Sequence, residues 1–233
     1  MIDLHPAAVS RRRLHWDFLG RVPYREAVER QHAARDAIKR GEGVERLLLL
    51  EHPPVYTLGR NASAADVLAA PEWLAAQGIA VEECDRGGQV TYHGPGQLVG
   101  YPIVNLSPDR RDVRRYVRDL QEVLIRTLAE YGVSAAVREG QAFIGVWAGH
   151  DQADKIASIG VHLSRWITTH GFALNVATDL SHFAGIIPCG LQGIGMTSIE
   201  KLTGRAPALA EVAAVCAGHF AAVFDRETDR EVA

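Results

Sequence analysis

The chain has 233 residues, of which 47% are apolar and 23% are charged, proportions typical of a soluble globular protein. Its formal net charge is −3, from 25 basic and 28 acidic side chains, so the overall charge does not favour binding to nucleic acid or to a membrane surface. The sequence contains neither the run of about 20 apolar residues that a transmembrane helix needs nor the apolar segment of a signal peptide. We therefore expect a cytoplasmic protein with no nucleic-acid or membrane partner.

Apolar spacing and turn residues predict both strands and helices in the first half of the chain. A leucine-rich run is too short for a helix and predicts a buried strand, and a later stretch interrupted by glycines predicts several strands. In chain order these elements are a strand at Leu14–Phe18, a helix at Tyr24–Arg40, strands at Arg46–Glu51 and Val55–Leu58, a short helix at Ala64–Gln77 and β structure over Ala80–Asn105.

The second half begins with the clearest helix, Asp112–Tyr131, whose apolar residues recur every three or four positions. Ser107 and Pro108 suit its N-cap and first turn. Successive strands are expected over Ala142–Ala177, with a hairpin turn at Gly149–Gln152, and a closing helix over Pro207–Phe224. Strands and helices are grouped and do not alternate strictly, which predicts an α+β fold with a mixed, mostly antiparallel sheet flanked by helices.

Cys189 is the first candidate for chemistry. Three cysteines at unrelated spacing favour neither a disulfide framework nor a Cys-x-x-Cys metal site. Cys189 lies between a proline and a glycine, so a stiff loop presents its thiol either to a pocket or to the core. Cys84 is surrounded by acidic residues that disfavour a thiolate, and Cys216 has the surroundings of a core residue.

Two further segments carry candidate residues. The glycine-rich segment Arg86–Gln97 matches neither a Walker phosphate loop nor a Rossmann fingerprint, and it is either a bulged hairpin or a substrate-binding loop with His93 at its centre. Lys155 precedes an apolar run and is either a partly desolvated base or a solvated lysine at a turn. The ten histidines show no metal-ligand spacing, so no metal site is expected.

Taken together, five segments of the chain resemble the lipoyl(octanoyl) transferase family. They occur in the order found in that family, between about Trp16 and Glu200. The five segments are Leu49–Arg60, Arg86–Gln97, Lys155–Val161, His170–Asn175 and Ile187–Gly190.

The resemblance implies a role for each candidate. Cys189 matches the nucleophile that forms the acyl thioester, and Lys155 matches the lysine that lowers the pKa of this cysteine and acts as a general base. The implied fold is that of the biotin and lipoate protein ligase catalytic domain, as a single catalytic domain over residues 1–233 with a core from about residue 16 to about residue 225 and short flexible ends. The residues that match the acyl-substrate lining are Arg86, Gly87, Gly88, Gln89, Val90, Thr91, Tyr92, His93, Ser158, Ile159, Gly160, Gly171, Phe172 and Ala173.

The reaction implied by the resemblance is the first step of protein lipoylation. An octanoyl or lipoyl group passes from acyl carrier protein to a lysine of a lipoyl domain, in the 2-oxoacid dehydrogenase complexes or in the glycine cleavage H protein. No cofactor is implied, neither ATP nor a metal. The spacing of four arginines adds a hypothesis of our own, a docking patch for the acidic carrier protein, with a merely solvated helix face as the alternative. These arginines are Arg111, Arg114, Arg115 and Arg118.

Three other functions remain open at this point. An ATP-dependent lipoate or biotin ligase of the same fold would activate its acid as an adenylate and would need no cysteine. A cysteine hydrolase would release free octanoate, and a non-catalytic carrier-binding module would leave Cys189 without an acyl group. The requirement for ATP and the effect of Cys189→Ser separate these possibilities.

Overall fold

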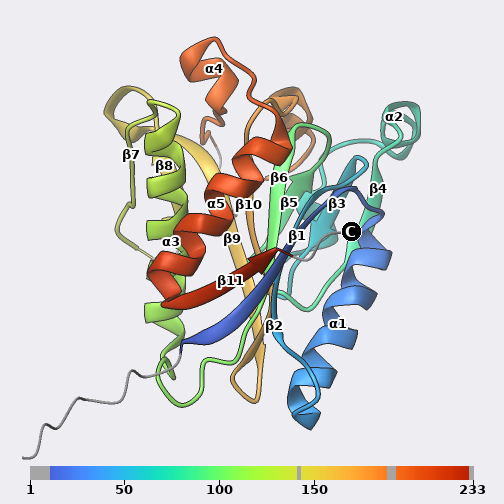
Figure 1. Ribbon diagram of the computed structural model, residues 1–233. Coiled ribbons are helices and arrows are strands. Elements are labelled where there is room, and N and C mark those ends of the chain that lie inside the picture. The colour runs from blue at the N-terminus through green and yellow to red at the C-terminus, as the bar shows by residue number, and fades with distance from the viewer. Residues whose placement is uncertain (1–10, 141–142, 188–192, 231–233) are drawn as a thin grey trace, which may run out of the picture.

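The computed structural model describes residues 11–140, 143–187 and 193–230. Cys189 lies outside these ranges, as do the first ten and the last three residues of the chain. A sheet of eight strands in the order β11-β1-β2-β6-β10-β9-β8-β7 crosses the molecule (Figure 1). Its strands are β1 (Arg12–Arg21), β2 (Glu45–Glu51), β6 (Gln97–Ile103), β7 (Ala135–Ala136), β8 (Gly145–Ala148), β9 (Asp154–Ser164), β10 (Ile167–Asn175) and β11 (Arg226–Arg230).

The remaining elements are a smaller sheet and the helices around it. Strands β4 (Ala80–Glu83), β3 (Val55–Leu58) and β5 (Val90–His93) form the smaller sheet in that order. The α-helices are α1 (Tyr24–Arg40), α2 (Pro71–Gln77), α3 (Val113–Glu130), α4 (Ile199–Thr203) and α5 (Leu209–Phe224), and the 3₁₀ segments are η1 (Ala64–Asp66), η3 (His150–Gln152) and η4 (Leu180–Gly185). Five of the seven strand pairs in the large sheet are antiparallel, which confirms the expected α+β fold.

Two apolar layers cover opposite faces of the large sheet. Helices α3 and α5 pack together over one face (Figure 1), and their buried side chains form the main core with those of the strands beneath them. Helix α1 covers the other face, where Ala27 packs against Leu48, Leu50 and Tyr101. The predicted bounds of α1 are confirmed, and Gly41 ends the helix with φ 76°, a backbone conformation that glycine adopts without strain.

Helix α3 begins at a different residue from the one expected. Its N-cap is Asp112, whose carboxylate accepts hydrogen bonds from the backbone N–H groups of Arg114 (2.8 Å) and Arg115 (3.0 Å). The prediction that Ser107 and Pro108 would form the N-cap and first turn is therefore wrong, because the nearer Asp112 satisfies the free N–H groups of the helix. Val113, the first residue of α3, is 43% exposed, and the buried face of the helix starts at Tyr116.

The predicted helix at Ala64–Gln77 is also wrong as one continuous element. The structure has the short 3₁₀ segment η1, closed by a capping box between Ser63 and Asp66, and a separate helix α2 that starts at Pro71. Proline has no N–H to donate and fits the first turn of a helix better than its interior, so a new helix begins there. The predicted last residue, Gln77, is confirmed, and Gly78 follows it as the C-cap with φ 63°.

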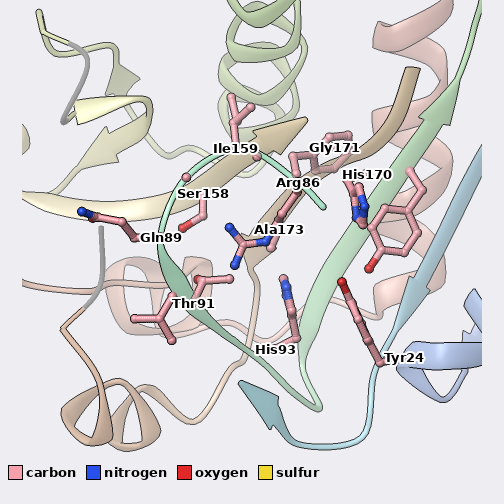
Figure 2. A pocket seen from close by; sticks show the side chains of 15 residues that line it. Tyr24, Arg86, Gln89, Thr91, His93, Ser158, Ile159, His170, Gly171 and Ala173 are labelled. Carbon is pink, nitrogen blue, oxygen red and sulfur yellow. The ribbon is translucent and has the colours of Figure 1, made fainter. Parts of the chain in front are cut away.

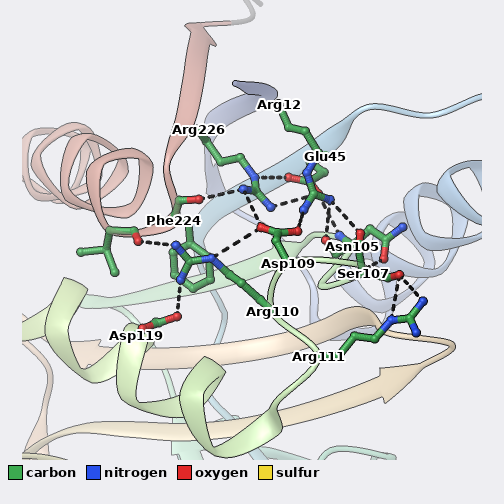
Figure 3. A network of polar contacts seen from close by, with 11 residues as sticks. Arg12, Glu45, Asn105, Ser107, Asp109, Arg110, Arg111, Asp119, Phe224 and Arg226 are labelled. Atoms are coloured by element: carbon green, nitrogen blue, oxygen red, sulfur yellow. Dashed lines mark hydrogen bonds and ion pairs between the residues drawn. The ribbon is translucent and has the colours of Figure 1, made fainter. Parts of the chain in front are cut away.

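Strand β11 was not expected, because its sequence, Arg-Glu-Thr-Asp-Arg, has no alternation of apolar residues. It pairs in parallel with β1 at the edge of the sheet. A buried ion network beside this edge holds the two strands together (Figure 3): the Glu45 carboxylate accepts hydrogen bonds from Arg226 Nε (2.6 Å), Arg12 Nη1 (3.0 Å) and the backbone N–H of Asn105 (3.0 Å). The polar sequence at both chain ends thus contributes directly to the fold.

Candidate active site

The three segments expected to line an acyl substrate lie side by side in the fold. In the antiparallel pair β9–β10, Gly160 is opposite Gly171 and Ser158 is opposite Ala173. The glycine-rich loop that follows β4 crosses the edge of β9, where the backbone N–H of Gly87 donates to the carbonyl oxygen of Val161 at 3.0 Å. The fold therefore brings together residues that are about 80 positions apart in the sequence.

These segments form a pocket with an apolar wall and a polar end (Figure 2). Twelve of the fourteen residues expected in the lining contact it, and Tyr24, Tyr101 and His170 complete it; the twelve are Arg86, Gly88, Gln89, Val90, Thr91, His93, Ser158, Ile159, Gly160, Gly171, Phe172 and Ala173. The other two, Gly87 and Tyr92, do not line it. Tyr92 lies on the opposite face of β5, where it packs against Tyr56 and Phe183 and bonds to His182. Thr91 and His93, the neighbours of Tyr92 in the strand, point to the opposite face and line the pocket, as the two-residue period of a strand predicts.

The pocket is narrow, with a volume of about 50 Å³. Pockets for drug-sized ligands have volumes of roughly 300–1,000 Å³, so an acyl chain needs side chains at the pocket to move. Gln89 lies at one side of the pocket (Figure 2). The backbone approaches closely within the glycine-rich segment at Gly96, where an added Cβ would lie 2.3 Å from the carbonyl oxygen of Ala177.

Arg86 is buried at the centre of the pocket, with 8% of its surface exposed. Its Nη2 donates to the carbonyl oxygen and the hydroxyl of Thr57, at 2.6 and 2.8 Å, and its Nη1 donates to the carbonyl oxygen of Gly87 at 3.2 Å. These bonds fix the loop against β3. Within the described part of the chain, Arg86 Nε is buried without a hydrogen-bond acceptor, so this N–H is a donor that a bound substrate can use.

Neutral histidines and tyrosines surround the polar end of the pocket, where His93 and Tyr101 line it and His52 packs behind them. His52 Nδ1 donates to the carbonyl oxygen of Val22 at 2.6 Å, and its Nε2 lies 2.8 Å from the Tyr101 hydroxyl. Burial lowers the pKa of His52 to about 4 and lowers that of His93 well below its ordinary value. Burial likewise raises the pKa of Tyr101. Each of these groups is therefore uncharged at neutral pH.

His170 is held in an unusual backbone conformation at the same end of the pocket. Its φ is 56°, its backbone N–H donates to Gln31 Oε1 at 2.6 Å, and its Nε2 donates to Asp85 at 2.7 Å. Non-glycine residues with positive φ are strained and cluster at functional sites. His170 could be found from the sequence only through its place in the motif before Gly171, and no local signal marked Tyr24 as a pocket residue.

The buried neutral histidines predict that the protein loses stability in mild acid. His52 has a pKa of about 4 in the folded chain and about 6.5 in the unfolded chain, so the unfolded state takes up a proton first as the pH falls. Stability should fall by about 2 kcal/mol between pH 7.5 and pH 5 from this group alone. Urea denaturation of the wild type and His52→Gln at both pH values measures this contribution.

The His52→Gln variant should lose about 2 kcal/mol less than the wild type over this pH interval. His150→Gln is the matched control, because the His150 side chain is 95% exposed; its pH dependence should equal that of the wild type. Equal pH dependence in His52→Gln and the wild type would contradict the assignment.

Lys155 is buried, with 1% of its surface exposed, so it is not a solvated lysine at a turn. Its Nζ lies 5.4 Å from the centroid of the Trp147 ring. A β-bulge controls its direction: Val146 is opposite Ala157 but Trp147 is opposite Lys155, so Ile156 is an extra residue in β9. Residues three apart point to opposite faces of a regular strand, and the extra residue brings Lys155 to the face of Ser158, which lines the pocket.

The segment that carries Cys189 is attached at both of its described ends. Before it, the backbone N–H of Ile187 donates to the carbonyl oxygen of Asp66 at 2.8 Å. After it, Gly195 and Thr197 bond to the backbone of Lys155 at 2.9 and 3.0 Å, and Met196 forms a β-bridge with Lys155. Lys155 is therefore paired with chain only six positions beyond Cys189.

The other candidates are structural or outside the pocket. Cys216 is fully buried in α5, and burial raises its pKa to about 12, which confirms it as a core residue. Cys84 is half-buried and its thiol donates to the carbonyl oxygen of Leu58. Within residues 11–140, 143–187 and 193–230 no group of three or more His, Cys, Asp or Glu side chains has the geometry of a metal site, and none of the helices there is long and apolar enough to cross a membrane.

Comparison with known proteins identifies the family. Residues 23–221 match the lipoyl protein ligase A/B catalytic domain. The chain belongs to this family. It is 50% identical over 212 residues to an octanoyltransferase of Myxococcus xanthus, and the match covers 90% of the chain and 59% of that longer protein. It is 51% identical over 209 residues to an octanoyltransferase of Solibacter usitatus, and this match covers 90% of the chain and 92% of the relative. The resemblance drawn from the motifs, and the acyltransferase class it implies, are confirmed.

Solved structures confirm the expected fold at low sequence identity. A lipoate-protein ligase A bound with ATP superimposes with a TM-score of 0.72 at 17% identity, covering 95% of this chain and 89% of that one. A bipartite lipoate protein ligase from Thermoplasma acidophilum gives a TM-score of 0.71 at 17% identity, with coverage of 95% and 86%. The biotin protein ligase of Aquifex aeolicus gives a TM-score of 0.55 at 11% sequence identity, covering 91% of this chain and 70% of that one.

Proposed function

We propose that the protein transfers an octanoyl group from acyl carrier protein to a lysine of a lipoyl domain, through a thioester on Cys189. The observation that carries this proposal is the position of Lys155. It is a buried lysine on the pocket side of β9, bonded through its backbone to the segment that follows Cys189. The names of the relatives and the pocket support octanoyl transfer, and Lys155 supports the assignment of Cys189 as the nucleophile.

The reaction proceeds in two steps that balance without another reagent. Lys155 takes the thiol proton of Cys189, and the thiolate attacks the carbonyl carbon of the donor thioester. The carrier thiolate leaves and takes this proton from the Lys155 ammonium, which returns Lys155 to its neutral form. The acceptor lysine amine then attacks the Cys189 thioester, the Cys189 thiolate leaves, and Lys155 accepts the proton of the amine. The first step exchanges one thioester for another and the second forms a more stable amide, so no ATP is consumed.

An unassisted cysteine is poorly suited to the first step. With a pKa of about 8.5, a free cysteine is only about 3% thiolate at pH 7. A lysine amine beside the thiol leaves a thiolate–ammonium pair and increases the charged fraction. Burial of Lys155 next to the Trp147 ring gives its ammonium form a favourable electrostatic partner.

Apolar burial supplies the affinity for the acyl chain. At roughly 0.8 kcal/mol per methylene, an eight-carbon chain gains about 5 kcal/mol. Ile159, Phe172 and Ala173 provide apolar surface, and the buried His93 and Tyr101 at the polar end limit how far a chain can extend. One methylene too many costs about 1–3 kcal/mol, enough to favour octanoyl over longer chains.

The arginines at the start of α3 are the proposed docking patch for the acidic carrier protein. Arg114 and Arg118 are exposed on the helix, whereas Arg111 lies before the N-cap and its guanidinium donates to Ser107 Oγ. The patch is close to the proposed acyl pocket: Val113 and Val117 of α3 line a neighbouring cavity. That cavity shares Gly88, Gln89, Ile159 and Gly160 with the acyl pocket.

Charge reversal at Arg114 and Arg118 should weaken carrier binding without unfolding the protein. The double variant Arg114→Glu/Arg118→Glu should raise the KM for octanoyl-acyl carrier protein about tenfold at low salt, with kcat unchanged, because rim charges act mainly on association. Arg40→Glu/Arg126→Glu makes the same change in net charge away from the patch and should leave the KM unchanged. Equal KM values in both double variants would remove this docking site.

An ATP-dependent ligase is the competing enzyme, since solved relatives of the same fold include a lipoate-protein ligase A bound with ATP. The deciding experiment incubates the protein with octanoyl-acyl carrier protein and a lipoyl domain, with and without ATP. We expect octanoylation of the lipoyl domain at the same rate in both. A requirement for ATP, or modification from free octanoate alone, would contradict the proposed function.

A further inference from the structure

Gly145 lies where the Lys155 side chain passes over strand β8. A Cβ added at Gly145 would lie 2.5 Å from Lys155 Cε and 3.2 Å from Lys155 Nζ. It would also lie 2.5 Å from the carbonyl oxygen of Ala157. The Lys155 side chain thus passes through space that a side chain at position 145 would occupy.

The backbone at Gly145 is specialised as well. Its φ is 144°, a conformation that residues with a Cβ rarely adopt. Its carbonyl oxygen accepts a hydrogen bond at 3.0 Å from Gln121 Nε2, a buried side chain of α3. The peptide is therefore held from the far face of the sheet, and its orientation is set by a contact independent of Lys155.

We propose that Gly145 is a positioning residue for Lys155. The bulge at Ile156 turns the lysine toward the pocket face, Trp147 bounds its amine on one side, and the bare backbone of Gly145 leaves room for the last methylene. Gln121 holds that backbone in place. This inference rests on the proposed function, because it concerns the amine that ionises Cys189.

The test is the pH profile of acyl-enzyme formation with octanoyl-acyl carrier protein. In Gly145→Ala the amine is displaced and Cys189 ionises as a free cysteine, at about pH 8.5. The rate at pH 7 should fall about 30-fold, and the deficit should narrow above pH 9, where the thiol ionises without help. A loss of structural integrity alone would reduce the rate equally at every pH.

Gly132→Ala is the matched control, because Gly132 also has a positive φ (74°) but no atom lies within 4 Å of an added Cβ. It should keep the wild-type pH profile. Gln121→Leu removes the hydrogen bond to the Gly145 carbonyl oxygen and should shift the profile in the same direction as Gly145→Ala, by a smaller amount. If Gly145→Ala does not fold, Gln121→Leu becomes the test of the proposal. A wild-type pH profile of acyl-enzyme formation in Gln121→Leu would then overturn it.

The double variant Gly145→Ala/Lys155→Met separates this inference from the proposed function. If Gly145 acts through Lys155, the double variant is no slower than Lys155→Met alone, whereas an additional loss overturns the proposal. A wild-type profile in Gly145→Ala together with a shifted profile in Lys155→Met refutes only the role of Gly145. A wild-type profile in Lys155→Met refutes the proposed pairing of Lys155 with Cys189 itself.

Discussion

Replacing Lys155 with methionine should slow octanoyl transfer at pH 7 by a factor of about 30 to 10,000. The lower value is the effect of the reduced thiolate fraction of Cys189 alone, about 3% at pH 7. The upper value is the limit of a general-base contribution of about 10²–10⁴, which is lost when no group accepts the proton of the acceptor amine. Methionine keeps the length and most of the volume of the buried lysine chain against Trp147, so the fold should be retained. Steady-state transfer to a lipoyl domain at several pH values measures the effect.

Two further variants sharpen this test. Lys155→Arg keeps a positive charge that can stabilise the thiolate, but its guanidinium cannot accept a proton at neutral pH. It should therefore fail mainly in the second step, transfer to the acceptor amine. Lys39→Met removes a surface lysine of α1 that pairs with Asp36 and should leave the rate unchanged. Wild-type transfer by Lys155→Met would disprove the role assigned to this lysine.

Glu45→Ala should lower the free energy of unfolding by about 3–5 kcal/mol. The Glu45 carboxylate is 7% exposed and accepts hydrogen bonds from Arg226, itself 3% exposed, and from Arg12 (Figure 3). Its removal takes the most buried counterion from two guanidinium groups and leaves them only Asp109, a more exposed partner, so the buried charge of Arg226 is poorly compensated. Guanidinium chloride denaturation at pH 7 measures the change.

Glu42→Ala is the control for this prediction. Glu42 forms an ion pair with Arg40 at 2.6 Å, but both side chains are about 60% exposed. Exposed pairs contribute about 0–1 kcal/mol, so this variant should remain within about 1 kcal/mol of the wild type. If Glu45→Ala were no less stable than Glu42→Ala, the ion network could not be what holds β11 to β1.

The sequence predicted most elements because their apolar periodicity is strong. Helix α1 and strand β3 have the predicted bounds, and the α+β class follows from grouped strands and helices. Strand β11 has no such signal, since its stability comes from pairing with β1 and from the Arg226–Glu45 contact, a partner 181 positions away. Apolar periodicity in a sequence reports which side of a segment contacts the core. It therefore cannot predict a charged strand that is held by ion pairs.

The site was predicted in part. Motif resemblance selected three segments that the fold does bring together around one pocket, but it also selected Tyr92, which the strand period places on the other side of β5. The direction of Lys155 depends on the bulge at Ile156, and no residue in that run marks a bulge. Tyr24 reaches the pocket only because α1 packs on the sheet there, a tertiary arrangement that local sequence does not encode.

Intact-protein mass spectrometry after mixing with octanoyl-acyl carrier protein tests the central claim most directly. We predict that the wild type gains one octanoyl group, that hydroxylamine at neutral pH removes it as expected for a thioester, and that addition of a lipoyl domain transfers it to the lysine. Cys189→Ser should remain unmodified and should not octanoylate the lipoyl domain at a measurable rate. Full transfer by Cys189→Ser, or a wild type that transfers octanoyl without ever carrying it, would contradict the account.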